Sequence, residues 1–513
     1  MENTMIGDET VTISKAEYES MQHQITWLME QLALLKRHRF GTSSEQLDAD
    51  MRQQLSLFHE AEALSDHSLP EPELEEITCK RSKQKGKREQ DLSGLPVERI
   101  EHELSPEERI CPECGDVMDD IGVHIHRGLK MIPARMVVVE DVIHTYACQP
   151  CGKTGDHTPM VTAPVPEALI PGSLATPSLV SYLMTQKYQN GLPFYRLEKG
   201  FQFDGINISR QTMANWIIAC AGNYLLAIYL LMISFLLREP AIHADETTYQ
   251  VLRELGRRPQ TKFYEWVYRT SGCAAHPIVI YEYQETRGHE HPEKFHQDFK
   301  GYLHTDGYEG YHRLPESITV VGCWFHARQY WENLLKTIPK DKRAGSAAAQ
   351  GLGYIEKLFA FEREWKNLAP EKRLEQRLAK SKPVSDAFFD WTGSLGALPK
   401  SLLGQAVHYA LSQRKYLENV YLDGRLELSN NRAERSVKPF VIGRKNWLFA
   451  TSPEGAKVSS IIYSIIETAK ENGLRPFQYM QYLLETLPNT TTGNLKPLLP
   501  WSKTLPDDCR VPS

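Results

Sequence analysis

The 513-residue chain is short of cysteine, of excess basic charge and of long apolar runs. Nine cysteines are too few for a disulfide scaffold in a chain of this length, and their number is odd. A formal net charge of −6 does not indicate a nucleic-acid partner, so any contact with DNA must come from locally clustered basic residues. Residues 1–10 are polar and acidic and lack the apolar segment of a secretory signal. We therefore expect a cytoplasmic protein of several domains.

The apolar stretch at residues 224–237 is too short to cross a membrane. A transmembrane helix needs about 20 predominantly apolar residues, whereas this stretch has 14 and is closed by Asn223 and Arg238. We therefore expect a buried core helix and no membrane partner.

Ser14 and Glu17 have the spacing of a capping box and indicate an N-terminal helix. Apolar residues then recur at alternating steps of three and four, at Tyr18, Met21, Ile25, Leu28, Leu32 and Leu35. This pattern fits a single amphipathic helix packed on its own chain, and it also fits a coiled coil between chains. The regular period of about 3.5 residues favours a coiled coil that makes a homo-oligomer.

Residues 49–100 show no persistent period and contain a dense basic run. Its six cations are Lys80, Arg81, Lys83, Lys85, Lys87 and Arg88. Such a run is usually solvated linker, yet six cations this close together also suit the phosphates of DNA. Both interpretations remain open.

Four cysteines form two close pairs, Cys111 with Cys114 and Cys148 with Cys151, and a glycine follows each pair. Two such pairs supply the four thiolates of a closed, structural zinc site. The gap between them is longer than the usual stretch of about 15–20 residues, and Met136–Val142 within it is strand-like, as in a hairpin. A redox pair or a disulfide pair is the alternative, but two pairs together favour one zinc ion.

The next segment predicts two short helices around a turn. Leu192–Lys199 forms the first helix, Gly200–Asn207 the turn, and Ser209 caps a second helix that begins with Arg210 and Gln211. This arrangement suits a helix-turn-helix whose Arg210 and Gln211 contact DNA, and it suits a plain helical hairpin equally well.

The middle of the chain predicts an α/β layer. Five runs rich in β-branched and aromatic residues indicate strands at Ala241–Ala244, Phe263–Tyr268, Pro277–Tyr283, Tyr302–Thr305 and Ile318–Cys323. Helical patterns follow from about Tyr330 to Val420, and a final helix lies near Ile461–Glu471. Strands followed by helices suggest an α/β domain with a helical insertion.

Three acidic residues stand out because of where they fall. Asp245 ends the first of these strands, Asp306 ends the fourth, and Glu434 lies in a short helix that Ser429 or Asn430 caps and a proline stops. An RNase H-like nuclease has this layout of acids, and magnesium prefers such oxygen ligands. Two ions about 3.5–4 Å apart activate the attacking oxygen and stabilise the leaving oxygen in an in-line displacement.

Each acid also has an ordinary explanation. Asp306 and the glycine after it form a common turn pair, Glu434 can pair with Lys438 one helical turn later, and Asp245 can cap a helix. Only the order of the three acids and their positions relative to the strands favour the catalytic interpretation over these ordinary explanations.

Ordered motifs extend along most of the chain. They include Arg39–Glu45, Pro133–Arg135 between the cysteine pairs, His243–Thr247, Thr305–Tyr308, Cys323–Arg328, Asn430–Arg435 and Gly443–Phe449. With these motifs the sequence resembles the IS66 family of insertion-sequence transposases over about residues 37–487. It departs from the usual family pattern at three positions, Ser429, Lys438 and Gln329.

The resemblance implies an RNase H-like catalytic domain whose DDE triad is Asp245, Asp306 and Glu434. It implies two catalytic magnesium ions, for which manganese can substitute. It also implies binding to terminal inverted repeats and to target DNA, with accessory proteins encoded by the same element.

A Cys-x-x-His follows the second acid in other RNase H-like transposases, and Cys323 and His326 match it here. We therefore expect them, with the nearby Arg328, to support the metal-binding acids rather than to hold a second zinc. Cys323 alone behaves as a small hydrophobe at the end of a buried strand.

Phosphate contacts are expected from Arg432, Arg435, Arg444 and Lys445, because guanidinium groups match phosphate geometry. Trp447 either stacks on an unpaired base near the cut or is buried in the core. In the mechanism we expect, metal-activated water attacks a phosphodiester at the element's end. The freed 3′-hydroxyl then attacks target DNA without a covalent protein intermediate.

The predicted fold class is multidomain α+β. Its segments are an oligomerisation helix (1–48), a charged linker (49–100), a zinc ribbon (101–160), a helical DNA-binding region (161–237), the first part of an RNase H-like domain (238–335), a helical insertion (336–423), the second part of that domain (424–487) and a tail (488–513). Two rival functions remain, a zinc-ribbon DNA-binding regulator without catalysis and a stand-alone RNase H-like nuclease. Strand transfer separates them, because the regulator does nothing and the nuclease cuts without joining.

Overall fold

The computed structural model of the chain describes residues 97, 99, 116, 117, 125, 129, 135–147, 160–165, 167–490 and 493–512. The predicted coiled coil, the basic run from Lys80 to Arg88 and the four paired cysteines lie outside these residues, so those predictions remain untested. The described residues belong to two compact units, a main one over 167–511 and a smaller one that contains 135–147 and 160–165.

The smaller unit contains one antiparallel strand pair. Strand β1 (Thr145–Ala147) pairs with β2 (Met160–Thr162), and all six residues are exposed. The strand predicted at Met136–Val142 is wrong, because residues 135–144 have no regular secondary structure. Their side chains are exposed, so β-propensity alone has no packing partner to support it.

The main unit begins with helices. These are α6 (Pro177–Tyr188), α7 (Phe194–Phe203), α8 (Arg210–Cys220), a π segment (Ala221–Leu225) and α9 (Leu226–Leu236). The Ser209 hydroxyl accepts the Thr212 amide at 3.1 Å, which confirms the predicted cap. The predicted turn at Gly200–Asn207 starts too early, because α7 continues to Phe203 and buries Phe201.

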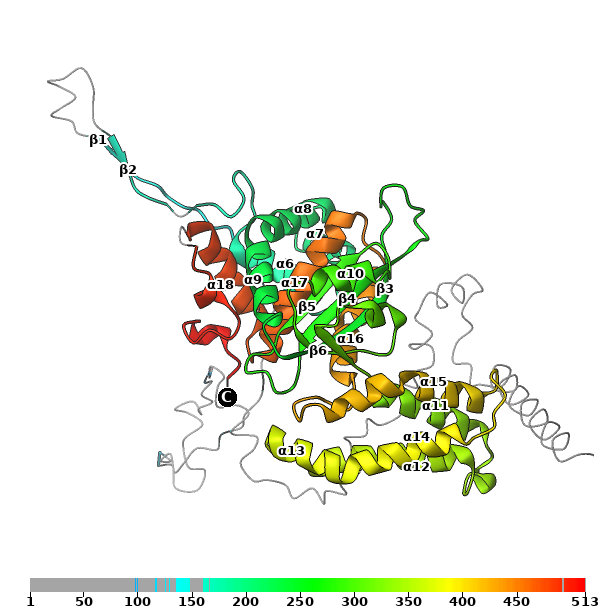
Figure 1. The fold of residues 1–513 in the computed structure, drawn as a ribbon. Helices are drawn as coiled ribbons and strands as arrows, with labels where there is room; N and C mark the ends of the chain where they lie inside the picture. Colours follow the sequence, from blue (N-terminus) through cyan, green and yellow to red (C-terminus); the bar gives the residue numbers. More distant parts are fainter. Residues whose placement is uncertain are drawn as a thin grey trace, which may run out of the picture. The chain divides into compact units, whose positions relative to one another are not determined.

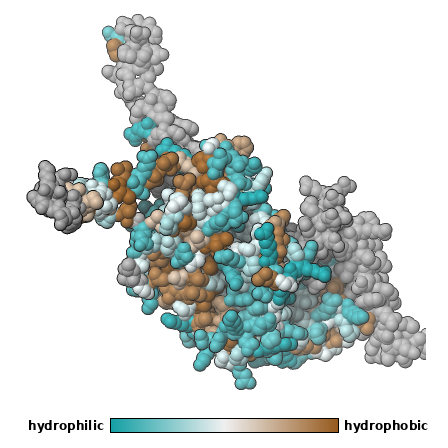
Figure 2. Space-filling view, turned by 90° about the horizontal axis from the view of Figure 1, so that it is seen from above, coloured by the Kyte–Doolittle hydropathy of each residue, from teal (hydrophilic) through white to brown (hydrophobic). Residues whose placement is uncertain are grey.

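Residues 210–236 form one continuous helical segment. Among the described residues it alone is long and apolar enough to span a membrane by length and composition, with 39% of its most apolar window buried. The predicted core helix is correct for the face of α9 that buries Ile228 and Met232, whereas Leu230 is 53% exposed. Figure 2 shows hydrophobic and hydrophilic patches side by side on the face of the molecule that it draws.

A five-stranded sheet lies at the centre of the main unit (Figure 1). Its strands are β3 (Ala241–Gln250), β4 (Lys262–Thr270), β5 (Val279–Gln284), β6 (Gly301–His304) and β7 (Ile318–Val321), in the spatial order β5-β4-β3-β6-β7. The pairs β3/β4 and β4/β5 are antiparallel, whereas β3/β6 and β6/β7 are parallel. All five predicted strands are therefore present.

One strand boundary was predicted wrongly. Asp245 does not end the first strand, because β3 continues to Gln250 and stays paired with β4 as far as Lys262. The β-branched and aromatic residues after Asp245 explain the extension, since they pack well on a pleated surface. Asp245 therefore lies in mid-strand, opposite Val267.

Two helices that follow in the sequence pack against this sheet. Helix α16 (Asn431–Trp447) contacts β3, and α17 (Pro453–Glu471) lies along β5. The hydroxyls of Ser464 and Thr468 accept the amides of Tyr281 and Val279 at 2.8 and 3.0 Å. Because β5 is the last strand on its side, α17 covers an otherwise open sheet edge.

The helix predicted around Glu434 is longer than expected. Pro439 does not stop it, because α16 continues to Trp447. Val437 and Phe440 are buried on either side of the proline, and this packing offsets the lost backbone hydrogen bond. The helix predicted near Ile461–Glu471 is likewise not the last, since α18 (Pro476–Thr486) follows and packs on α6.

Between β7 and α16 lies a helical region with its own core. It comprises α11 (Trp324–Thr337), α12 (Ala347–Glu364), α13 (Pro370–Gln376), a π segment (Arg377–Ser381), α14 (Lys382–Gly393) and α15 (Leu402–Leu417). Trp324, Trp331 and Phe388 fill this core. The short elements of the main unit are α10 (Glu290–Phe295) and the 3-10 helices Glu309–Arg313, Lys340–Lys342, Glu418–Tyr421, Leu487–Asn489, Lys496–Leu498 and Asp507–Cys509.

Candidate active site

The three predicted acids come from three separate elements of the main unit. Asp245 lies in β3, Asp306 lies two residues beyond the end of β6, and Glu434 lies in the first turn of α16. Burial raises the pKa of Asp245 well above its usual value, and the negative charges of Asp306, Glu246 and Glu434 raise it further. The fold therefore gathers four carboxylates into one region.

The loop after β6 fixes Asp306. The Tyr308 amide donates to its Oδ1 at 2.9 Å, and the Tyr409 hydroxyl donates to its backbone carbonyl at 3.0 Å. Gly307 lies between Asp306 and Tyr308 and has a φ of +99°, which a residue with a side chain rarely adopts. Asp306 therefore forms the turn with Gly307 and is also the predicted metal ligand, so its two interpretations do not exclude each other.

Asn430 ties the helix of the third acid to the strand of the first. Its side-chain amide donates to the Ala244 carbonyl at 2.8 Å, and its Oδ1 accepts from His243 Nδ1 at 3.0 Å. Its backbone amide donates to Cys323 Sγ at 3.1 Å. Asn430 is fully buried and stands at the N-cap position, but its side chain binds β3 instead of capping α16.

Two stacked histidines lie beneath this contact. The rings of His243 and His304 are 4.3 Å apart and nearly parallel. Burial lowers the pKa of His243 to about 4 and that of His304 well below its usual value, so both rings are neutral at pH 7. Neutral His243 donates from Nδ1 to Asn430, and His304 Nε2 accepts the Glu427 amide at 3.3 Å.

Sequence analysis missed Glu246, the residue next to Asp245. Glu246 is 3% exposed. Its Oε1 accepts Arg287 Nε at 2.7 Å, and its Oε2 accepts the Tyr311 hydroxyl at 2.8 Å. Burial and the charge of Asp306 raise its pKa to about 7, against the opposing effect of Arg287.

Arg287 links this buried acid to Asp306, the second of the three predicted acids. Its Nη2 lies 3.9 Å from Asp306 Oδ2, and its guanidinium lies 4.0 Å from the centre of the Tyr308 ring. One cation thus faces two of the four carboxylates. The only sequence signal for this pairing was Glu246 within the His243–Thr247 motif.

One member of the carboxylate cluster also belongs to a second group of metal-ligand side chains. This group consists of Cys323, His326 and Glu434. Their ligand atoms lie within 4.8 Å of one another, close enough to hold a metal ion. His326 Nδ1 is 3.8 Å from Glu434 Oε1. The predicted neighbour Arg328 is directed elsewhere, since its guanidinium binds Glu332 and Glu356 at 2.9 and 2.6 Å.

The predicted DNA-contact residues of α16 differ in exposure. Arg435 and Lys445 are exposed, and Arg432 binds Glu427 at 2.8 Å. Arg444 is buried and donates to the hydroxyls of Thr247 and Thr248 at 3.3 Å. That contact holds α16 on β3.

Trp447 is partly buried and packs against the core of the main unit. Its ring lies 5.7 Å from that of Tyr249 and 5.6 Å from that of Phe440, which supports the core interpretation. In α8, Arg210 and Gln211 are exposed at the helix start. This placement is compatible with both interpretations of the two helices.

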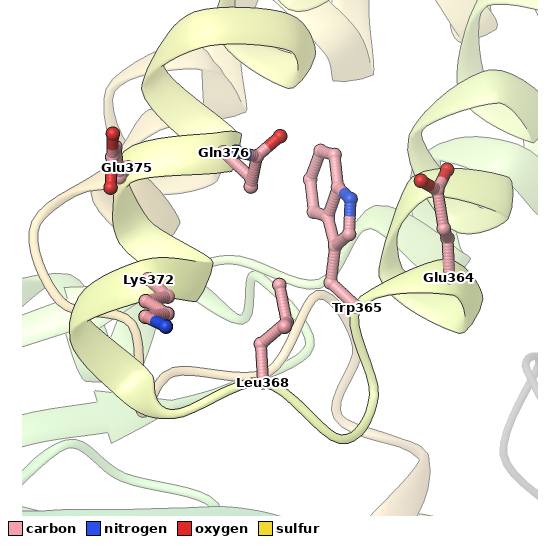
Figure 3. Close-up of a pocket in the computed structure, with 6 residues that line it drawn as sticks. All are labelled: Glu364, Trp365, Leu368, Lys372, Glu375 and Gln376. Atoms are coloured by element: carbon pink, nitrogen blue, oxygen red, sulfur yellow. The ribbon is translucent and has the colours of Figure 1, made fainter.

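A pocket of about 280 Å³ lies at the turn between α12 and α13 (Figure 3). It is lined by Glu364, Trp365, Leu368, Lys372, Glu375 and Gln376. All six residues belong to the helical region, and none of them contributes to the carboxylate cluster.

Most of the chain matches models of one protein family. Residues 172–458 match the model of the transposase IS66 family, and residues 464–501 match the IS66 C-terminal element. Residues 108–152 match the zinc-finger binding domain of transposase IS66, and residues 27–100 match the model described as transposase C of IS166 homeodomain.

Three proteins of Sinorhizobium fredii are similar over most of the chain. The uncharacterized protein y4qI is 29% identical over 506 residues, covering 95% of this chain and 91% of its own length. The uncharacterized protein y4jD is 26% identical over 508 residues, with 95% and 96% covered. The uncharacterized protein y4hP is 28% identical over 411 residues, with 76% and 73% covered. Because the family model spans more than half of the sequence and encloses all three clustered acids, the chain belongs to the transposase IS66 family.

Proposed function

We propose that this DNA-binding transposase cuts and joins DNA strands at Asp245, Asp306 and Glu434 by metal-dependent in-line phosphoryl transfer. The observation that carries the proposal is the convergence of these acids from a strand, a loop and a helix. Counted along the chain, the first acid lies on the first strand of the sheet (β3) and the second follows the fourth strand (β6). The third lies on a later helix, α16. The mixed strand order supports an RNase H-like domain, and the helices between β7 and α16 support the proposed insertion.

The donor set fits hard divalent cations. Carboxylate oxygens suit magnesium or manganese, and mutual repulsion makes a bare group of four carboxylates unfavourable without a counter-ion. Glu434 Oε1 is buried without a hydrogen-bond partner among the described residues. When bound, two magnesium ions would polarise the attacking and leaving oxygens of the phosphodiester.

The chain's own residues prepare this arrangement before substrate binds. Asn430 sets the position of Glu434 relative to Asp245, and the Tyr308 amide orients the Asp306 carboxylate. Arg287 offsets part of the negative charge between Glu246 and Asp306. Such fixed geometry lowers the reorganisation needed during the reaction.

The other predictions complete the proposal. Terminal inverted repeats and target DNA are the substrates, and the paired cysteines hold one structural zinc. The N-terminal helix joins copies of the chain, and other element-encoded proteins assist.

The test replaces each acid with its amide. Asp245→Asn, Asp306→Asn and Glu434→Gln should each abolish cleavage of element ends in magnesium while leaving binding of the same DNA nearly intact. Each change removes a ligand charge at similar volume. Asp390→Asn in α14 and Glu375→Gln in α13 are matched controls, because both acids are exposed in the helical region.

Three outcomes separate the proposal from its rivals. Near-normal strand transfer by any triad variant would remove that residue from the site. Cutting without joining by the wild-type protein would identify a nuclease, and DNA binding without cutting would identify a regulator.

A further inference from the structure

Helix α16 is unusually basic for this chain. It carries five basic residues and one acidic residue, Glu434, in a protein of net charge −6. Three of the cations, Arg435, Lys438 and Lys445, are exposed. Their spacings of three and seven residues place them on one face of the helix, with the 60%-exposed Ile442 between them.

This face begins at the carboxylate cluster and leads away from it. Helix α16 lies along β3 in the direction of the strand, since Asn430 binds Ala244, and Arg444 binds Thr247 and Thr248 further on. From Arg435 to Lys445 the helix rises about 15 Å. That length equals about four steps of one DNA strand at about 3.4 Å each.

Two loops join at the far end of this helix. The Leu252 amide donates to the Ala450 carbonyl at 3.0 Å, and the Arg253 amide donates to the Thr451 carbonyl at 3.1 Å. These bonds hold the loop between β3 and β4 against the loop between α16 and α17. Arg253 and Arg258 of the first loop are both exposed.

An apolar tip lies on the same two loops. Leu255 is 93% exposed, Leu448 is 57% exposed and Phe449 is 40% exposed. Leu448 has a φ of +64°, and no other described residue besides glycine has a positive φ. With a ψ of −50° and a hydrogen bond from the Phe449 amide to the Trp447 carbonyl at 2.8 Å, Leu448 is the centre of a γ-turn of positive φ, a rare and strained conformation. Local strain of this kind gathers at functional sites.

We propose that these features form one surface for duplex DNA, which extends the proposed function to a path for the substrate. The basic track (Arg435, Lys438, Lys445, Arg253 and Arg258) contacts phosphates of the duplex that leads away from the cut. The apolar tip (Leu255, Leu448 and Phe449) contacts bases at the far end of that track, as apolar wedges do at distorted base steps.

Charge on the surrounding residues favours this occupant over a protein partner. The loop between β3 and β4 contains one acid, Glu254, whose carboxylate accepts the Tyr283 hydroxyl at 2.6 Å. The next acid after the tip is Glu454, in the first turn of α17. Residues 435–453 therefore contain no acid, and the loop between β3 and β4 contains only Glu254.

The first experiment measures how DNA binding depends on salt. The triple variant Arg435→Gln/Lys438→Gln/Lys445→Gln is prepared in full-length protein that also carries Asp245→Asn, so that cutting does not interfere. If each cation contacts a phosphate, the slope of log binding constant against log salt should flatten by about 0.9 per residue, or about 2.7 in all. The control Lys357→Gln/Lys366→Gln/Lys372→Gln removes the same charge from exposed residues of the helical region.

The DNA probes distinguish two sources of the duplex. One is a duplex that ends in the terminal repeat bordering this gene, and the other has the same composition in shuffled order. Flattening with the terminal duplex assigns the track to the element's end, whereas flattening with the shuffled duplex alone assigns it to target DNA. A slope that equals that of the control protein on both duplexes would overturn the proposal. Because no cutting is measured, this result is independent of the triad test.

The second experiment tests the apolar tip. The probe is the terminal duplex with 2-aminopurine placed in turn at each of the base pairs leading inward from the cut. Wild-type protein should raise the fluorescence at one of these positions through unstacking. The variant Leu255→Ser/Phe449→Ser should lose that rise and bind about tenfold more weakly. Leu378→Ser is the control, because Leu378 is 49% exposed in the helical region, away from the proposed DNA surfaces. Unchanged fluorescence and affinity in a folded tip variant would contradict base contact.

Discussion

The Asn430 side-chain amide donates a hydrogen bond to the Ala244 carbonyl at 2.8 Å, directly before Asp245 in β3. The same side chain accepts from His243, and its backbone amide binds Cys323. One buried residue therefore sets the distance between the first and third acids.

Asn430→Ala should reduce strand cleavage strongly while leaving DNA binding close to normal. The change removes both side-chain bonds, leaves His243 without its partner, and should cost about 1–3 kcal/mol of stability. The control is Asn431→Ala, one residue further along α16. Thermal unfolding and cleavage rates are compared at a temperature where both variants are fully folded. Cleavage at the wild-type rate there would show that Asn430 serves stability alone.

The four paired cysteines predict one zinc ion for each chain. Cys148→Ser should release it and destabilise the ribbon, because structural zinc contributes folding free energy on the order of 10 kcal/mol. Cys323→Ser should keep it, although Cys323 lies with His326 and Glu434 in a group that a metal ion would fit. Metal analysis of purified protein measures both variants. Two zinc ions in the wild type, with one lost in Cys323→Ser, would contradict this prediction.

The helical region contains a glycine that its packing requires. A Cβ at Gly351 in α12 would lie 2.4 Å from Cε3 of Trp331, a fully buried ring. Gly351→Ala should therefore destabilise the protein by about 1–3 kcal/mol through overpacking. Gly353→Ala in the same helix meets nothing within 4 Å and should stabilise by up to about 1 kcal/mol. Chemical unfolding of the two variants gives the comparison, and a shift in the same direction for both would refute the packing argument.

Sequence patterns were sufficient for the strands and for the order of the acids. Runs of β-branched and aromatic residues identify all five strands, and a polar residue after such a run located Asp306. The ends of elements were predicted less well, because tertiary packing decides them. Strand β3 continues past Asp245 through pairing with β4, and α16 continues past Pro439 through burial of Val437 and Phe440.

The supporting contacts of the site could not be predicted from the sequence. Glu246 follows Asp245 in a strand, where neighbouring side chains point to opposite faces, so its pairing with Arg287 is a property of the fold. The sequence predicts Asn430 as a helix cap. Its hydrogen bond to the Ala244 carbonyl arises only because α16 packs on β3. Arg444 has the guanidinium group that suits a phosphate ligand. In the fold, however, its side chain is buried and donates to the Thr247 hydroxyl.

Glu265 gives the protein a stability that depends on pH. It is fully buried in β4, opposite Thr247, and burial raises the pKa of its carboxyl well above the usual value, with a smaller contribution from the charge of Glu282. The folded chain therefore holds a proton that the unfolded chain releases above a pH of about 4.3. The stability from this group is complete below that pH and is lost as the pH rises through the folded-state pKa.

Glu265→Gln removes the ionisation and keeps the shape of the side chain. The variant should resemble the wild type near pH 4. As the pH rises towards 8 its advantage should grow by about 1.4 kcal/mol for each pH unit until the folded-state pKa of Glu265 is reached, because only the wild type must keep a carboxyl neutral. Thermal unfolding between these two pH values measures the difference. Glu282→Gln should behave similarly, since burial raises the pKa of Glu282 to about 7. The control is Glu293→Gln, an exposed change in α10 that should leave the difference flat across the range. A Glu265→Gln protein whose advantage does not grow with pH would show that the Glu265 carboxyl is already ionised in the folded chain.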